Sequence, residues 1–159
     1  MEEKNTKQNF ETMPVATICN GTVIDHIPSS KLFKVASLLH LETAAQPITI
    51  GNNFPSKLLG RKGIIKISDQ FVSDDILNRI ALIAPNVHLN IIRNYQVVEK
   101  KCVQLPEEII GIVRCPNPKC ITNHEPMATR FRSNSNQEET TIACSYCGRK
   151  IKSEQIELL

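Results

Sequence analysis

The chain of 159 residues contains no tryptophan, and aromatic residues make up only 4% of it. Its core must therefore be built from isoleucine, leucine and valine. No run of about 18 apolar residues occurs, so we expect no membrane span and no membrane partner. The first 13 residues are polar and lack the apolar stretch of a secretory signal, so a cytoplasmic location is expected. The hydrophobic content of 41% excludes the disordered class.

The sequence also lacks the common catalytic motifs. It has no nucleophile elbow, no phosphate-binding P-loop and no dinucleotide glycine fingerprint. The one suggestive pair is Asp25-His26, but adjacent side chains point to opposite faces of a regular strand and act together only where the strand bulges or ends. The other histidines, at 40, 88 and 124, are isolated in sequence and favour surface or helix-end roles. The motifs in the sequence therefore give no support for an enzyme.

Four of the six cysteines form two close pairs, Cys115/Cys120 and Cys144/Cys147, separated by 23 residues. Two such pairs can form a tetrahedral shell around one Zn²⁺, and four protein ligands leave no open position, so the metal would be structural. Two disulfides or four buried free thiols are the alternatives. The other two cysteines, Cys19 and Cys102, lie outside this set and are expected to be reduced.

The formal net charge is +3, and its distribution is informative. Residues 1–106 carry 12 basic and 9 acidic residues, whereas residues 107–159 carry 7 of each. A zinc module that binds nucleic acid normally presents a basic face. The balanced second half therefore argues against a nucleic-acid partner, although a zinc-ribbon nucleic-acid protein remains a competing hypothesis, as does a nucleotide-dependent enzyme.

Hydrophobic patterning predicts the elements of the first half. We expect one helix at 31–40, capped by Ser29 or Ser30, and a second that is capped by Ser73 and stops before Pro85. A loop is expected at 51–56. Strands are expected at 21–27, 47–50, 63–68, 87–92 and 95–98. The order β-α-β-β-α-β predicts an α+β class: a ferredoxin-like split βαβ antiparallel sheet with two helices on one face. Many functions use this fold, so it assigns none by itself.

The second half is predicted to be a small all-β zinc-binding domain. Strands are expected at 109–113, 129–132 and 140–143, with a hairpin turn at 133–136. The domains are predicted as a flexible arm at 1–13, a first domain at 14–104 and the zinc domain at 105–159. Because the second domain has a small core, a bound metal should supply much of its stability.

Lysines gather near the ends of predicted strands, at 62, 66, 100 and 101. Several ammonium groups around one patch could hold a polyphosphate, while Asn90 and Tyr95 could serve a base. The alternative is a solvated basic edge that discourages strand pairing.

The sequence resembles the regulatory chain of aspartate carbamoyltransferase from about Val15 to Lys150. The resemblance is carried by the strings Gly21–Pro28, Ile48–Gly51, Gly60–Lys62, Ile65–Ile67, Ala84–Pro85, Asn94–Tyr95, Leu105–Pro106 and Cys115–Asn117, together with the second cysteine pair. It departs at Ala16, Cys19 and Asn20, where better-known members carry charged residues.

The resemblance implies a non-catalytic subunit of pyrimidine biosynthesis, with a nucleotide-binding allosteric domain and a zinc domain that docks the catalytic chain. It implies regulatory dimers, three of which bridge two catalytic trimers in a heterododecamer. CTP would inhibit, UTP would assist in some members, and ATP would activate.

The resemblance also assigns the nucleotide contacts. Asp25, His26 and Lys66 would meet the ribose and phosphates, and Lys100 would meet the phosphates. The base would be surrounded by Ile18, Asn90, Ile92, Tyr95 and Val97, and Val15, Thr17 and Val23 would line the same cleft.

Overall fold

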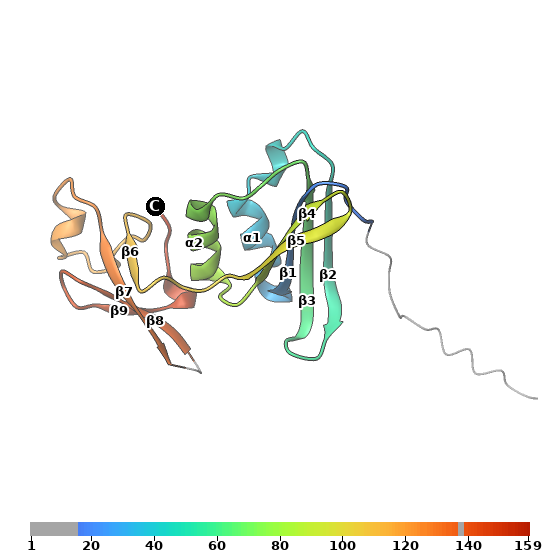
Figure 1. The fold of residues 1–159 in the computed structure, drawn as a ribbon. Coiled ribbons are helices and arrows are strands. Elements are labelled where there is room, and N and C mark those ends of the chain that lie inside the picture. Colours follow the sequence, from blue (N-terminus) through green and yellow to red (C-terminus); the bar gives the residue numbers. More distant parts are fainter. Residues whose placement is uncertain (1–15, 137–138) are drawn as a thin grey trace, which may run out of the picture.

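The computed structural model describes residues 16–136 and 139–159, which form two antiparallel sheets with helices between them (Figure 1). Residues 1–15, which include Val15 and the predicted arm, lie outside the described residues. Within the described ranges, no helix has the length and apolar character needed to cross a membrane.

The first sheet has five strands in the order β2-β3-β1-β4-β5, all antiparallel to their neighbours. Their bounds are Gly21–Pro28 for β1, Ile48–Ser56 for β2, Gly60–Ser68 for β3, His88–Arg93 for β4 and Gln96–Cys102 for β5. The predicted split βαβ arrangement is confirmed, with β5 added at one edge.

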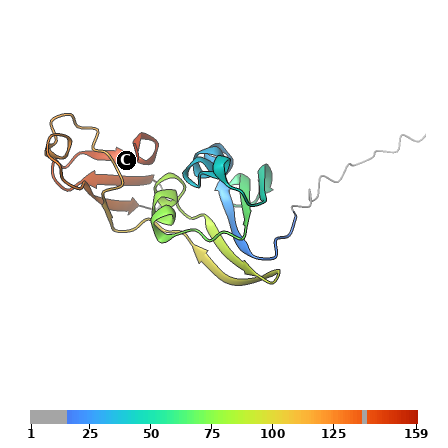
Figure 2. The ribbon, with the colours of Figure 1, turned by 90° about the horizontal axis from the view of Figure 1, so that it is seen from above.

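Two helices cover one face of this sheet. They are α1 (Leu32–Leu38) and α2 (Asp74–Ile83), and α2 lies on the side of the second sheet (Figures 1 and 2). Short 3-10 helices, η1 (Ser29–Lys31) and η2 (Leu41–Thr43), flank α1. Ser73 caps α2 as predicted, because its side chain accepts a hydrogen bond from the Ile76 amide.

Alternation along the strands determines which side chains meet the helices. Ile24, Ile65, Ile67 and Leu89 are buried in one core with α1 and α2 residues such as Val35. Because side chains alternate along a strand, the intervening residues lie on the opposite face of the sheet, which we call the outer face. The predicted aliphatic core is thus confirmed on one face only.

The second sheet has four strands in the order β6-β7-β8-β9. Their bounds are Glu108–Ile110 for β6, Arg130–Asn136 for β7, Glu139–Cys144 for β8 and Lys150–Lys152 for β9, with 3-10 helices η3 at Ile121–Asn123 and η4 at Ser153–Gln155. Phe131 and Ile142 are almost completely buried in its core beside three of the paired cysteines. This half is the predicted small all-β domain.

The two halves are in direct contact. Leu82 of α2 is fully buried in the core of the second half, and Leu105 packs against both cores. Arg79 of α2 donates from Nη1 to the backbone oxygen of Leu159, at 3.0 Å.

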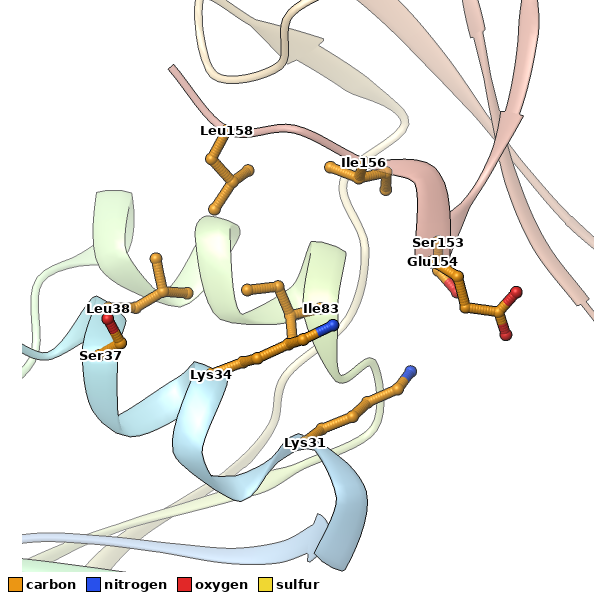
Figure 3. A pocket seen from close by; sticks show the side chains of 9 residues that line it. All are labelled: Lys31, Lys34, Ser37, Leu38, Ile83, Ser153, Glu154, Ile156 and Leu158. Carbon is orange, nitrogen blue, oxygen red and sulfur yellow. The ribbon is translucent and has the colours of Figure 1, made fainter.

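A cavity of about 310 Å³ lies between α1, the end of α2 and the C-terminal segment (Figure 3). Its lining residues are Lys31, Lys34, Ser37, Leu38, Ile83, Ser153, Glu154, Ile156 and Leu158.

Three local predictions are wrong. Residues 51–56 belong to β2 rather than to a loop, and residues 133–136 belong to β7 rather than to a turn. The helix α1 follows η1 and has no side-chain cap from Ser29 or Ser30. Pairing with β3 decides the first of these structures, and pairing with β8 within a hairpin decides the second.

Candidate functional site

The four paired cysteines converge at one point of the second domain. Their Sγ atoms all lie within 4.8 Å of one another, and the distances are 3.6 Å between Cys115 and Cys147 and 3.8 Å between Cys120 and Cys144. Four sulfurs about 2.3 Å from one ion at the corners of a tetrahedron would be roughly 3.8 Å apart. All six cysteines are free thiols, so the arrangement fits a single metal ion rather than two disulfides.

Local backbone structure positions both pairs. In the first loop, Asn123 donates from Nδ2 to the carbonyl oxygens of Cys115 and Asn117, at 2.9 and 2.8 Å. In the second, Gly148 has φ +76°, and its amide donates to the Cys144 carbonyl at 2.9 Å. Each cysteine pair therefore lies on a tight loop that aims both sulfurs inward.

The pKa shifts of these thiols indicate that the cluster requires a bound cation. Burial raises the pKa of Cys115 to about 12 and also raises the pKa of Cys144. Burial acts to raise the pKa of Cys147 too, but hydrogen bonds, led by the Arg149 backbone, lower it to about 6. Without a cation the four sulfurs cannot all be thiolates near neutral pH, and a divalent ion would supply the missing positive charge.

A second group of candidate residues lies in one row across the outer face. Strand register pairs Lys66 of β3 with Val23 of β1, Val23 with Asn90 of β4, and Asn90 with Lys100 of β5. Directly opposed residues share a face, so these four side chains lie on the same side of the sheet. Strands about 4.8 Å apart place Lys66 and Lys100 roughly 14 Å apart at the backbone, which two long side chains can bridge with one ligand between them.

The outer face continues in both directions from this row. Toward the β4–β5 turn, Ile92 pairs with Val97, and the Tyr95 side chain is 68% exposed. The segment that carries Thr17 and Ile18 runs beside this turn, since the Tyr95 amide donates to the Cys19 carbonyl at 2.9 Å.

Asp25 and His26 occupy the other end of the outer face. A β-bulge sets these two residues of β1 against the single residue Ile64 of β3, and His26 has φ +59°. The His26 amide donates to Asp25 Oδ1 at 2.7 Å, and its Nδ1 lies 3.4 Å from Asp25 Oδ2. The bulge therefore meets the condition under which these neighbours can act together.

Two residues of this cluster were not among the nucleotide contacts that the resemblance implied, although Lys62 belonged to the predicted lysine patch. Lys62 lies 3.0 Å from the Asp25 carboxylate, and the His88 ring lies 4.2 Å from the His26 ring. The period of two along β4 places His88 on the same face as Asn90 and is the sequence signal that could have found it. Of the predicted nucleotide contacts, all except Val15 thus lie on the outer face or along the segment beside its turn.

Comparison with known proteins agrees with this arrangement. Residues 13–104 match the family model described as the aspartate carbamoyltransferase regulatory chain, allosteric domain. Residues 107–157 match the model described as the metal binding domain of the same chain.

Individual relatives cover nearly the whole length. A Porphyromonas gingivalis protein is 61% identical over 94% of this chain and 98% of its own. A Bacteroides thetaiotaomicron protein is 53% identical over 96% and 99%. A Thermococcus gammatolerans protein is 46% identical over 91% of this chain and 95% of its own.

Each of these relatives is named an aspartate carbamoyltransferase regulatory chain, and the family model describes a regulatory rather than a catalytic chain. The names confirm the prediction that this chain is not itself the enzyme. With one allosteric domain followed by one metal-binding domain, the chain belongs to the family of aspartate carbamoyltransferase regulatory chains.

Proposed function

We propose that this chain binds nucleoside triphosphates on its outer face and transmits that binding to a catalytic chain of aspartate carbamoyltransferase. The observation that carries the proposal is the row of Lys66, Val23, Asn90 and Lys100 across four strands. From Gly21 to Asp25 the face measures about 14 Å along β1, comparable to an extended nucleotide.

The chemistry of the face suggests an orientation for the ligand. The exposed ring of Tyr95 and the apolar side chains of Ile92 and Val97 suit a base. Lys66 and Lys100 suit the phosphates, because ammonium groups act as mobile point charges for their oxygens. The Asp25 carboxylate is an acceptor suited to ribose hydroxyl groups.

The second domain is proposed to hold one structural Zn²⁺ through Cys115, Cys120, Cys144 and Cys147. Bound there, the metal supplies charge and cross-links but no reaction, since four thiolates leave no open position. The domain, proposed to span 105–159, would dock on the catalytic chain, while the domain at 14–104 binds nucleotide.

The assembly follows from the same proposal. Regulatory dimers would link catalytic trimers into a heterododecamer, in which CTP and UTP inhibit and ATP activates. A nucleotide shifts activity only as far as its affinity differs between the two quaternary states.

Calorimetric titration of the purified chain with CTP, UTP and ATP tests the nucleotide site. We expect Lys100→Ala to weaken binding by about tenfold or more, because it removes a charge-assisted phosphate contact. Lys57→Ala is the matched control, since Lys57 is exposed in the β2–β3 turn, and it should bind like the unaltered chain. Equal affinity of the Lys100 and Lys57 variants would remove Lys100 from the site.

Reconstitution with a cognate catalytic chain tests the second half of the proposal. The curve of activity against aspartate concentration should shift for the mixed complex when CTP, UTP or ATP is added. The same curve for the catalytic chain alone should not change. A complex that forms but ignores every nucleotide would contradict the regulatory role.

A further inference from the structure

Two imidazole rings are in contact at the end of the outer face. The ring centroids of His26 and His88 are 4.2 Å apart, with an angle of 36° between the ring planes. They come from neighbouring strands, because His88 of β4 lies opposite Asp25 of β1. The bulge at Asp25 and His26 brings the first ring over the second, so that the contact depends on the irregular strand.

The charged and titratable groups near this pair come from three strands, β1, β3 and β5. On β1 and β3, Asp25 and Lys62 form an ion pair at 3.0 Å. On β5, Cys102 is opposite His88, and in the adjacent row Lys66 and Lys100 lie on the same face. The pair therefore stands beside one carboxylate, which is ion-paired with Lys62, and one row away from Lys66 and Lys100.

This environment disfavours a charged imidazole in the ligand-free protein. Burial lowers the pKa of His26 below its ordinary value of 6.5; Asp25 opposes the shift, and Lys62 and His88 add to it. The Nδ1 atom of His26 is buried and makes no hydrogen bond to the described residues, although Asp25 Oδ2 lies 3.4 Å away. Burial, together with Lys62 and His88, thus outweighs the nearby Asp25 carboxylate and disfavours the charged form of His26.

We propose that His88 is a further ligand-binding residue, and that the His26–His88 pair takes up a proton when an oligophosphate binds on the outer face. This inference rests on the proposed nucleotide site and adds its regulation by pH. An anion next to the rings favours the imidazolium form and offsets the repulsion from the lysines. Because the two rings are in contact, a second proton is opposed by the first, and one proton is shared by the pair.

The sign of the pH dependence follows from this linkage. Bound ligand raises the pKa of the pair. At a pH between the pKa of the free protein and that of the complex, the complex therefore holds more protons. Affinity therefore increases as pH falls from 8 towards 6, by up to about tenfold per pH unit for one proton. Protonation of the terminal phosphate acts in the opposite direction, so the comparison with variants determines the contribution of the pair.

Proton NMR of the imidazole signals gives the direct test, since the chain has only four histidines. The probes are CTP, which carries base and phosphates, and inorganic tripolyphosphate, which carries phosphates alone. At pH 7 both should move the His26 and His88 signals towards the imidazolium position. The signals of His40 and His124, which lie outside the outer face, should stay in place.

Calorimetry supplies the second measurement. Titrations in two phosphate-free buffers of different ionisation enthalpy count the protons taken up, and we expect up to one per site. His88→Gln should bind CTP about tenfold more weakly at pH 6 and nearly normally at pH 8, since the lost contact is ionic only when protonated. His40→Asn is the matched control, because His40 is an exposed histidine with φ +51° that asparagine readily adopts.

The outcomes separate the two proposals. Failure of CTP, UTP, ATP and tripolyphosphate to bind at all would overturn the nucleotide site and the histidine inference together. Binding without proton uptake and without movement of the His26 and His88 signals would overturn the inference alone. The NMR result does not depend on a variant, so it holds even if His88→Gln folds poorly.

Discussion

Gly21 begins β1 in a conformation that no other residue can replace easily. Its φ is +138°, and an added Cβ would lie 2.0 Å from the Ile67 carbonyl oxygen and 3.0 Å from the Asp69 amide nitrogen. Both neighbours are backbone atoms of the adjacent chain segment and cannot move as a side chain would. The start of the central strand, and with it the outer face, therefore depends on the missing side chain.

We expect Gly21→Ala to lower the free energy of unfolding by about 4 kcal/mol or more, through steric overlap added to backbone strain. Gly60→Ala is the control, since Gly60 has φ +75° but open space around its Cβ position, and it should cost about 1–2 kcal/mol. Urea denaturation followed by circular dichroism measures both. Equal losses would show that the overlap at Gly21 relaxes freely.

At the scale of single elements, α2 shows how local signals set a boundary. Ser73 precedes the helix, Asp74 and Asp75 occupy its first turn, and the Ile76 amide donates to Ser73 Oγ at 3.5 Å. The hydroxyl satisfies one of the free amides of the first turn, and the acids favour the positive end of the helix dipole.

Ser73→Ala should destabilise the chain by about 0.5–1 kcal/mol, at the lower end for a cap because the hydrogen bond is long. Ser30→Ala is the comparison, since Ser30 is exposed and does not cap α1. Thermal unfolding of the two variants should show a lower midpoint for the first and little change for the second. A shift of the same size in both would mean that the cap bond contributes nothing.

The same contrast shows how much the sequence could predict. The cap of α2 and the two cysteine loops are local features and were predicted correctly in place and type. Residues 51–56 were not, because Gly51 and Pro55 disfavour strands, yet pairing with β3 holds them in an edge strand where proline is tolerated. The contact of His26 with His88 depends on a bulge and on the register between strands, neither of which a single sequence specifies.

At the scale of the whole molecule, the two domains share side chains in their cores. Leu82 belongs to α2 of the first domain, but its side chain is buried in the second core, in one cluster with Ile109 and Phe131. Disruption of the second core therefore exposes part of α2. This contact joins the core that contains three of the clustered cysteines to a helix that supports the first sheet.

The last prediction concerns removal of the metal. Cys115→Ser, or a strong chelator, should unfold the second domain, because the small core around Phe131 and Ile142 depends on the cross-link made by the ion. Cys102→Ser is the control, since Cys102 is an exposed thiol outside the cluster. Acidification should act like the chelator, because protons compete with the metal for the four sulfurs, and affinity for the metal falls as pH falls.

Two readouts separate the domains. Metal content by mass spectrometry should fall from one ion per chain to none in Cys115→Ser and stay at one in Cys102→Ser. Amide hydrogen exchange should then lose protection throughout β6 to β9, while β1 and β3 stay protected and α2 exchanges faster around Leu82. If the metal is lost and β7 and β8 stay protected, the second core is stable without the ion, and the cluster has another purpose than holding the domain together.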